Sequence, residues 1–215
     1  MKNRWYDLYY NDIQRNFGYK NYYNRKIRYR GKLIKKIEKY AFNKKVLEAG
    51  CGTGVFSIKL ADLGYESYAL DIDKDMLQIV EKISKEVGTN VPKMVQCDIF
   101  NLSNRFNNKL FDVTFSIGVY EHFDDKEIKL LLMEQNKISN YIFVGVPTRY
   151  FNENEKLYGN ERFLPYSYWR RIFKENNFSI IEEFNLYNQN LLKRIINIKK
   201  WFRPAPIRVF VIKSL

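Results

Sequence analysis

Three glycines alternate with small residues in the segment 50–54 (GCGTG), directly after the apolar run 45–49. Glycine takes positive φ without strain and leaves no Cβ between the backbone and a ligand. The amphipathic residues that follow predict a helix, and the free N–H groups at a helix start attract negative or polar groups. This order predicts a loop that holds a nucleotide-like or carboxylate-bearing ligand against its main chain.

Acidic residues lie at the ends of the next two predicted strands and in the strand that precedes this turn. Asp71 ends the second strand, where a carboxylate can accept both hydroxyls of a ribose. Asp98 follows the third strand, where it is expected to meet an adenine amino group while Ile99 covers the ring. Glu48 lies just before the turn and is expected to accept N–H bonds from the loop or to bind a cationic group.

His122 is the single histidine of the chain and follows the fourth predicted strand, where a ligand site should open. Imidazole titrates near neutral pH, so His122 is a candidate general base. Glu121 beside it is the second candidate. The alternative is a structural turn in which neither side chain takes part in chemistry.

The pattern of apolar residues, caps and breakers predicts the elements that must position these side chains. Expected helices cover 27–40, 55–63, 75–86, 125–137 and 165–175. Expected strands cover 45–49, 67–71, 92–96, 111–116, 141–146, 178–184 and 207–212. Strands that alternate with helices predict a parallel sheet covered on both faces, with ligands beyond the carboxyl ends of the strands.

Together these segments resemble the class I S-adenosylmethionine-dependent methyltransferases, especially their broad small-molecule group. The similar segments are VLEAGCGTG (46–54), ALDIDKDML (69–77), QCDIF (96–100), FDVTFSIGVYEHF (111–123) and YIFVGVP (141–147). The resemblance covers roughly residues 30–185. It implies an α/β, Rossmann-like three-layer sandwich whose seven-stranded, mostly parallel sheet has an antiparallel last strand at 207–212.

The resemblance implies S-adenosyl-L-methionine as the cofactor and no metal. The expected cofactor-binding residues are Glu48, Gly50, Cys51, Gly52, Gly54, Asp71, Ile72, Asp98, Ile99, Ser116 and Ile117. Arg28 or Arg30 is expected to pair with the carboxylate of the cofactor. Methyl transfer is an in-line displacement at a sulfonium carbon, so the protein mainly aligns the acceptor and excludes water.

The acceptor is expected to be the oxygen or nitrogen of a small metabolite. The aromatic N-terminal segment is predicted to form a lid over it. The expected lid residues are Tyr19, Tyr22, Tyr23, Tyr120 and Arg149. The chain is interpreted as one domain, with a basic N-terminal lid (1–44), a cofactor-binding core (45–185) and an insertion followed by the last strand (186–215).

The formal net charge of +13 is unevenly distributed. Residues 1–45 hold 14 Lys and Arg against 3 Asp and Glu, whereas residues 46–147 hold 10 against 15. Basic, aromatic flanks leave open an RNA methyltransferase or RNA-binding module. The stretch 191–203 (LLKRIINIKKWFR) leaves open contact with a membrane surface or a lipid-like substrate.

Composition excludes several other classes. Two cysteines and one histidine cannot build a disulfide framework or a four-ligand zinc site. With no apolar run of 18 residues and no secretory signal pattern, a reducing cytoplasm is the expected location. The alternative interpretation of the glycine turn is a nicotinamide-binding loop. That loop has the pattern G-x-G-x-x-G, in which the third glycine would stand at position 55 rather than 54.

Overall fold

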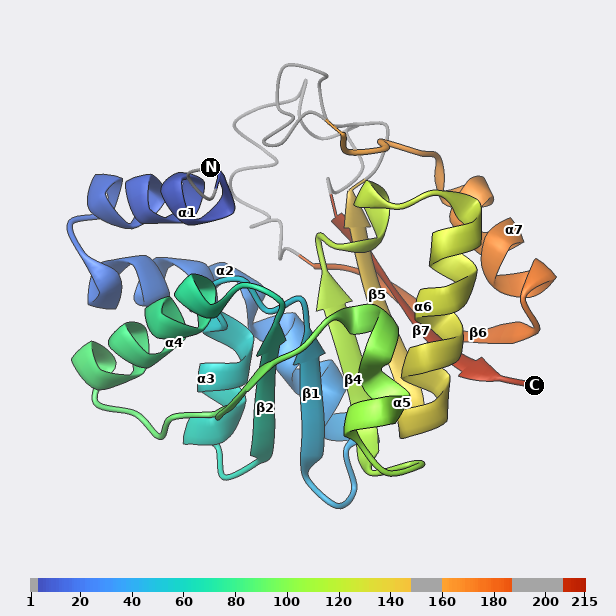
Figure 1. The fold of residues 1–215 in the computed structure, drawn as a ribbon, viewed down its shortest axis with the longest axis horizontal. Helices are drawn as coiled ribbons and strands as arrows, with labels where there is room; N and C mark the ends of the chain where they lie inside the picture. The colour runs from blue at the N-terminus through green and yellow to red at the C-terminus, as the bar shows by residue number, and fades with distance from the viewer. Residues whose placement is uncertain (1–3, 148–159, 187–206) are drawn as a thin grey trace, which may run out of the picture.

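A seven-stranded sheet forms the centre of the protein in the computed structural model, which describes residues 4–147, 160–186 and 207–215 (Figure 1). The strands are β1 (Lys45–Ala49), β2 (Glu66–Asp71), β3 (Lys93–Gln96), β4 (Phe111–Ile117), β5 (Ser139–Pro147), β6 (Phe178–Asn185) and β7 (Ile207–Ser214). Their spatial order is β3-β2-β1-β4-β5-β7-β6. β1 to β5 pair in parallel, and β7 lies antiparallel between β5 and β6. The predicted Rossmann-like fold with its antiparallel last strand is confirmed.

Helices cover both faces of this sheet. They are α1 (Arg4–Arg15), α2 (Tyr19–Tyr40), α3 (Val55–Asp62), α4 (Lys74–Val87), α5 (Leu102–Arg105), α6 (Asp125–Ile138) and α7 (Tyr166–Glu175). α2, α3 and α4 pack their apolar residues on one face, and α5, α6 and α7 pack on the other. Figure 1 shows α1 beyond α2 and α4, on the side toward which the parallel strands point.

Local signals in the sequence determine where the central helices begin and end. Asp124 and Glu127 form a capping box at the start of α6, with reciprocal bonds between side chain and backbone. Asp73 caps α4 by accepting a hydrogen bond from Asp75 N, and Gly88 ends that helix in the left-handed conformation. Asn177, at φ +63°, follows α7 in the same conformation.

The N-terminal segment differs from the prediction. The helix expected at 27–40 begins at Tyr19, and α1 was not predicted at all. Its aromatic residues gave no single apolar stripe, because some of them face the core and others face the site described below. Phe17 and Gly18, both at positive φ, separate the two helices.

Two of the predictions lie outside the described residues: the amphipathic stretch 191–203 and Arg149. Within the described ranges, no helix has the length and apolar character needed to cross a membrane.

The absence of a side chain at Gly54 allows the turn to pack closely against α4. It has φ +60°, and a Cβ there would lie 2.7 Å from Val80 Cγ2 of α4. Left-handed strain costs about 1–2 kcal/mol and overpacking about 1–3 kcal/mol, so Gly54→Ala should lower the free energy of unfolding by roughly 2–5 kcal/mol. Urea denaturation measures this loss.

Gly64→Ala is the matched control. Gly64 has φ +79° but nothing within 4 Å of the added Cβ, so the expected loss is about 1–2 kcal/mol, from backbone strain alone. Equal losses in the two variants would show that the close approach of Val80 adds nothing to the cost of a side chain at Gly54.

Candidate active site

The glycine turn is tied to the end of β2 by hydrogen bonds. Gly50 N and Cys51 N both donate to Leu70 O, at 2.9 and 2.8 Å. Gly52 N donates to Asp71 Oδ2 at 2.9 Å. Gly50 and Gly52 have φ of +72° and +53°, a backbone conformation that side chains disfavour. The hydrogen bonds therefore hold the turn at positive φ, next to the Asp71 carboxylate.

Asp71 is held at the rim of a cavity by the same turn. Burial raises the pKa of this carboxyl above its usual value, against hydrogen bonds from Asp73 N and Gly52 N that lower the pKa. A carboxylate has about four lone-pair sites, so Asp71 can still accept hydrogen bonds from a diol. Ile72 beside it is 64% exposed and presents an apolar surface to the same space.

This cavity, called here the loop cavity, has a volume of about 520 Å³. Its walls come from the glycine turn, the carboxyl ends of β2, β3 and β4, and α1. The lining residues include Trp5, Gly50, Cys51, Gly52, Asp71, Ile72, Met76, Asp98, Ile99 and Ile117. Asp98 accepts a hydrogen bond from Phe100 N at 3.0 Å, which holds its carboxylate at the end of β3.

The loop cavity fits an adenosyl group. A Cβ on Gly52 would lie 3.4 Å from Tyr9 Oη and would fill the space between the turn and α1, and a Cβ on Gly50 would lie 2.8 Å from Val119 Cγ2. Asp71 and Asp98 stand at neighbouring strand ends, where a ribose and an adenine amino group would find acceptors. The apolar side chains of Ile72 and Ile99 line the same cavity.

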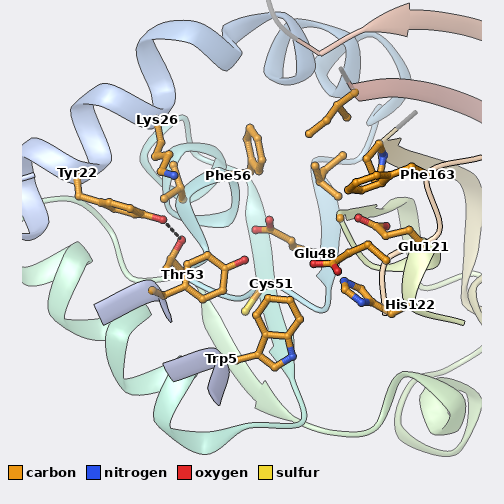
Figure 2. A pocket seen from close by; sticks show the side chains of 17 residues that line it. Trp5, Tyr22, Lys26, Glu48, Cys51, Thr53, Phe56, Glu121, His122 and Phe163 are labelled. Carbon is orange, nitrogen blue, oxygen red and sulfur yellow. Dashed lines mark hydrogen bonds between the residues drawn. The ribbon is translucent and has the colours of Figure 1, made fainter. Parts of the chain in front are cut away.

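A second cavity, called here the inner cavity, adjoins the first and has a volume of about 290 Å³. The two share Trp5, Tyr9, Cys51, Ile117, Gly118 and His122. In Figure 2, Tyr22 and Lys26 of α2 lie on one side of the inner cavity, and Glu121, His122 and Phe163 lie on the other. Glu48 and Cys51 lie between these two sides.

The α2 side is fixed by polar contacts. Tyr22 Oη lies 3.3 Å from Thr53 Oγ1, and Lys26 Nζ lies 2.8 Å from Asp12 Oδ2 of α1. Glu48 accepts hydrogen bonds from Ser57 N, at 3.0 Å, and from Ser57 Oγ, which ties the end of β1 to the first turn of α3.

Burial raises the pKa of the Cys51 thiol well above its ordinary value. The thiol therefore stays protonated, and a protonated thiol is not the nucleophilic form.

The segment 160–164 crosses the loop that follows β4 and contributes to the wall of the inner cavity that lies opposite α2. Arg162 N donates to Glu121 O at 2.9 Å, and the Arg162 guanidinium donates to Phe123 O, Asp125 and Tyr168. These bonds leave Glu161 and Phe163, the residues on either side of Arg162, lining the inner cavity.

His122 is oriented by a neighbour on each side. Its Nδ1 lies 2.7 Å from Asn160 Oδ1, and its ring meets that of Trp5 edge-on, with centroids 5.3 Å apart. An amide oxygen only accepts, so Nδ1 donates the proton of this bond, and in the neutral form of the ring Nε2 then has the lone pair. That tautomer suits a base.

Glu121 is 4% exposed, and burial raises the pKa of its carboxyl to about 8, with a further contribution from the nearby Glu161. Its Oε2 has no hydrogen-bond partner among the described residues. At neutral pH this side chain therefore holds a proton that an exposed glutamate would have lost.

The structure brings most of the predicted site residues to the two cavities. Those that line them are Glu48, Gly50, Cys51, Gly52, Asp71, Ile72, Asp98, Ile99, Ile117, Glu121, His122 and Tyr22. Among the described residues, no group of three or more His, Cys, Asp or Glu side chains is arranged to hold a metal ion.

Two of the predicted cofactor residues need correction. Ser116 is fully buried, and its Oγ accepts a hydrogen bond from Gln135 Nε2 of α6 at 3.1 Å, away from both cavities. Successive strand side chains alternate between faces, so it is Ile117 that lines the site. Gly54 lines neither cavity, and its lack of a side chain serves the approach of Val80.

The lid also differs from the prediction. Tyr23 and Tyr120 are buried in core clusters, Tyr19 packs against one of those clusters, and none of the three lines either cavity. Arg28 is exposed and lines neither cavity, while the side chain of Arg30, like Arg149, lies outside the description.

Sequence reasoning missed the residues that do cover the site: Trp5, Tyr9, Lys26, Glu161 and Phe163. A signal was present in the spacing. Trp5 and Tyr9 are four residues apart, as are Tyr22 and Lys26, so each pair shares one face of a helix.

The family described as "Methyltransferase domain" matches residues 42–198. The chain belongs to this family. The predicted methyltransferase family is thereby confirmed.

Relatives of this methyltransferase match over shorter stretches. The ubiquinone biosynthesis O-methyltransferase of Proteus mirabilis (strain HI4320) is 33% identical over 84 residues, which cover 39% of this chain and 34% of that protein. The malonyl-[acyl-carrier protein] O-methyltransferase of Buchnera aphidicola subsp. Baizongia pistaciae (strain Bp) is 35% identical over 94 residues, 38% of each. The chain thus spans about a third of the length of these curated relatives.

Solved structures share the fold of the methyltransferase at low identity. The PH0226 protein from Pyrococcus horikoshii OT3 has a TM-score of 0.65 at 19% identity, covering 90% of this chain and 92% of that one. Magnesium protoporphyrin IX methyltransferase from Synechocystis PCC 6803, with bound SAM, has a TM-score of 0.57 at 18% identity, covering 79% and 69%.

Glu121 should make stability depend on pH. Its folded pKa of about 8 lies above the ordinary 4.5, so the folded state holds a proton that the unfolded state loses between these values. The free energy of unfolding is therefore highest, as far as Glu121 is concerned, below pH 4.5. It falls as pH rises from 4.5 through 8, by on the order of 1 kcal/mol per pH unit. Glu121→Gln should therefore gain stability relative to the unaltered protein between pH 5 and pH 8 in urea denaturation.

Glu66→Gln is the control. Lys93 holds the pKa of Glu66 below its usual value, so that carboxylate stays ionised in both states across this range. Its substitution should change stability by the same amount at both pH values. Parallel pH dependence of Glu121→Gln and the unaltered protein would contradict the proposed burial of the Glu121 carboxyl.

Proposed function

We propose that this methyltransferase transfers a methyl group from S-adenosylmethionine to an oxygen atom of a small-molecule acceptor bound in the inner cavity. The observation that carries the proposal is the junction of the two cavities. The loop cavity presents Asp71 and the glycine turn, and it adjoins an inner cavity with His122 and Glu121 in its wall.

The residues of the loop cavity would hold the nucleoside half of the cofactor. Asp71 accepts from the ribose hydroxyls, Asp98 accepts from the adenine amino group, and Ile72 and Ile99 cover the ring. Lys26 takes the role expected of Arg28 or Arg30, because it lines the inner cavity and can reach an anionic group there. When bound, S-adenosylmethionine supplies a methyl group already activated by its positively charged sulfur.

The inner cavity would align the acceptor and keep water out. Trp5 and Tyr9 of α1 line both cavities, so α1 acts as the lid over the reacting atoms. His122, held by Asn160, accepts the acceptor's proton at Nε2 as the new bond forms. The protein thus supplies alignment and a proton acceptor.

Oxygen is favoured over nitrogen as the methylated atom because the curated relatives are named O-methyltransferases. The methyl acceptors of those proteins are not assigned to this chain, since the matched stretches cover about a third of those proteins. The comparisons lend no support to a nucleic-acid or membrane partner. A cytoplasmic location stays a prediction from the sequence.

Calorimetric titration with S-adenosylmethionine and S-adenosylhomocysteine tests the proposal. Both should bind, and Asp71→Ala or Asp98→Ala should each weaken binding by about 1–3 kcal/mol through loss of hydrogen bonds to a buried ligand. This corresponds to an increase in Kd of about 5- to 150-fold.

Asp62→Ala is the control, because Asp62 lies on the surface of α3 and pairs with Lys59. It should bind as the unaltered protein does. Failure of both ligands to bind at millimolar concentration would refute the proposed function, and unchanged affinity in the Asp71 and Asp98 variants would refute the assigned site.

A further inference from the structure

The carboxyl group of Glu121 is buried in the wall of the inner cavity, and one of its oxygens has no partner. The side chain is 4% exposed and lines this cavity. Its Oε2 makes no hydrogen bond among the described residues. A buried polar group that lacks a partner costs free energy, and a ligand that bonds to the group offsets this cost.

Backbone contacts fix this carboxyl group near the junction of the two cavities. Arg162 N donates to Glu121 O at 2.9 Å, and the guanidinium of Arg162 donates to Phe123 O at 2.6 Å. Oε1 of Glu121 lies 3.5 Å from the position of a Cβ on Gly118, a residue that lines both cavities. His122 also lines both cavities, whereas Glu121 lines only the inner one. A methyl acceptor whose reacting oxygen faces His122 can therefore reach Glu121 with a second polar group.

The protonation state of Glu121 determines which kind of partner it needs. Burial raises the pKa of this carboxyl to about 8, with a further contribution from Glu161, so at neutral pH the group is a neutral acid with one O–H donor. Apart from tyrosines, the other titratable side chains that line the inner cavity are Lys26, Glu48, Cys51, His122 and Glu161. Lys26 lies on the opposite side of the cavity (Figure 2). A neutral acid is matched by a ligand that offers an oxygen as hydrogen-bond acceptor.

We propose that the carboxyl group of Glu121 donates a hydrogen bond to a carbonyl oxygen of the methyl acceptor, while the hydroxyl group that is methylated faces His122. The inference rests on the proposed function, because it assigns the inner cavity to the methyl acceptor. It narrows the class of methyl acceptor to hydroxy carbonyl compounds. A carbonyl oxygen only accepts hydrogen bonds, so it matches an O–H donor. Glu121 is then a specificity-determining residue, and His122 alone takes up a proton.

Two phenols of similar shape test this assignment at pH 6.5. The probes are 3-hydroxyacetophenone and 3-isopropylphenol, which has a methyl group in place of the carbonyl oxygen. Aromatic probes are used because Trp5, Phe56 and Phe163 line the inner cavity. Each probe is titrated by calorimetry into protein saturated with S-adenosylhomocysteine. The ketone should bind about 3- to 10-fold more tightly, which is the contribution of one hydrogen bond.

Two substitutions of Glu121 separate the hydrogen bond from the shape of the wall. The glutamine amide donates as a neutral acid does, so Glu121→Gln should keep the preference for the ketone. Leucine has no donor, so Glu121→Leu should bind the ketone no more tightly than 3-isopropylphenol. Both variants should keep their affinity for S-adenosylhomocysteine, which shows that they are folded. Glu81→Gln, at a surface pair with Lys85, should behave as the unaltered protein does.

The dependence of binding on pH shows whether the proton of Glu121 is needed. The probe here is 3-methoxyacetophenone, the methylated form of the first ketone, because it has no titrating group. Its affinity for the unaltered protein should fall about 3- to 10-fold between pH 6.5 and pH 9.5, since Glu121 loses its proton near pH 8 and a carboxylate cannot donate. Glu121→Gln keeps the other titratable groups of the cavity, and its affinity should change by less than about twofold.

Four results would overturn the inference while leaving the proposed function intact. The first is equal or tighter binding of 3-isopropylphenol by the unaltered protein, and the second is a preference for the ketone that survives in Glu121→Leu. The third is a pH dependence that Glu121→Gln leaves unchanged. The fourth is failure of the ketone to bind at 10 mM to protein that does bind S-adenosylhomocysteine. Failure of the unaltered protein to bind S-adenosylhomocysteine would instead refute the proposed function itself.

Discussion

The site depends on the hydrogen bonds that fasten the glycine turn to the end of β2. Leu70 O receives two N–H groups of the turn, and Asp71 receives the N–H of Gly52. These bonds hold the turn at positive φ beside the loop cavity. Glu48 secures the same junction from β1 through Ser57. The proposed cofactor site is thus preorganised by hydrogen bonds in which the backbone N–H groups of the turn and of α3 are the donors.

Asp71 and Glu121, two acids at the carboxyl ends of parallel strands, lie in different environments. Asp71 receives two backbone N–H groups, which oppose the effect of burial on its pKa. Glu121 faces Glu161 and keeps an oxygen without a partner among the described residues. The first can still accept hydrogen bonds from neutral hydroxyls, whereas the second holds a proton at neutral pH. Their environments distinguish the loop cavity, proposed to hold the cofactor, from the inner cavity, proposed to hold the acceptor.

The sequence predicted the central sheet and most of the residues that line the loop cavity because short-range signals specify them. The glycine turn and Asp71 follow apolar strands, so their place at the sheet edge follows from topology. Ser116 was predicted wrongly because a motif does not show toward which face of the sheet each strand side chain points. Here the side chain of Ser116 points toward Gln135. Trp5 was missed because its place over His122 comes from packing between segments far apart in the chain.

The central claim is that the glycine turn, the ends of β2 and β3, and α1 together enclose the cofactor. Hydrogen–deuterium exchange with and without S-adenosylhomocysteine tests it most directly. Exchange should slow in residues 49–54, 71–76 and 98–100, and also in α1, while α6 and α7 should be little changed. Protection confined to other segments, or exchange in α1 that is unaffected by the ligand, would contradict this account.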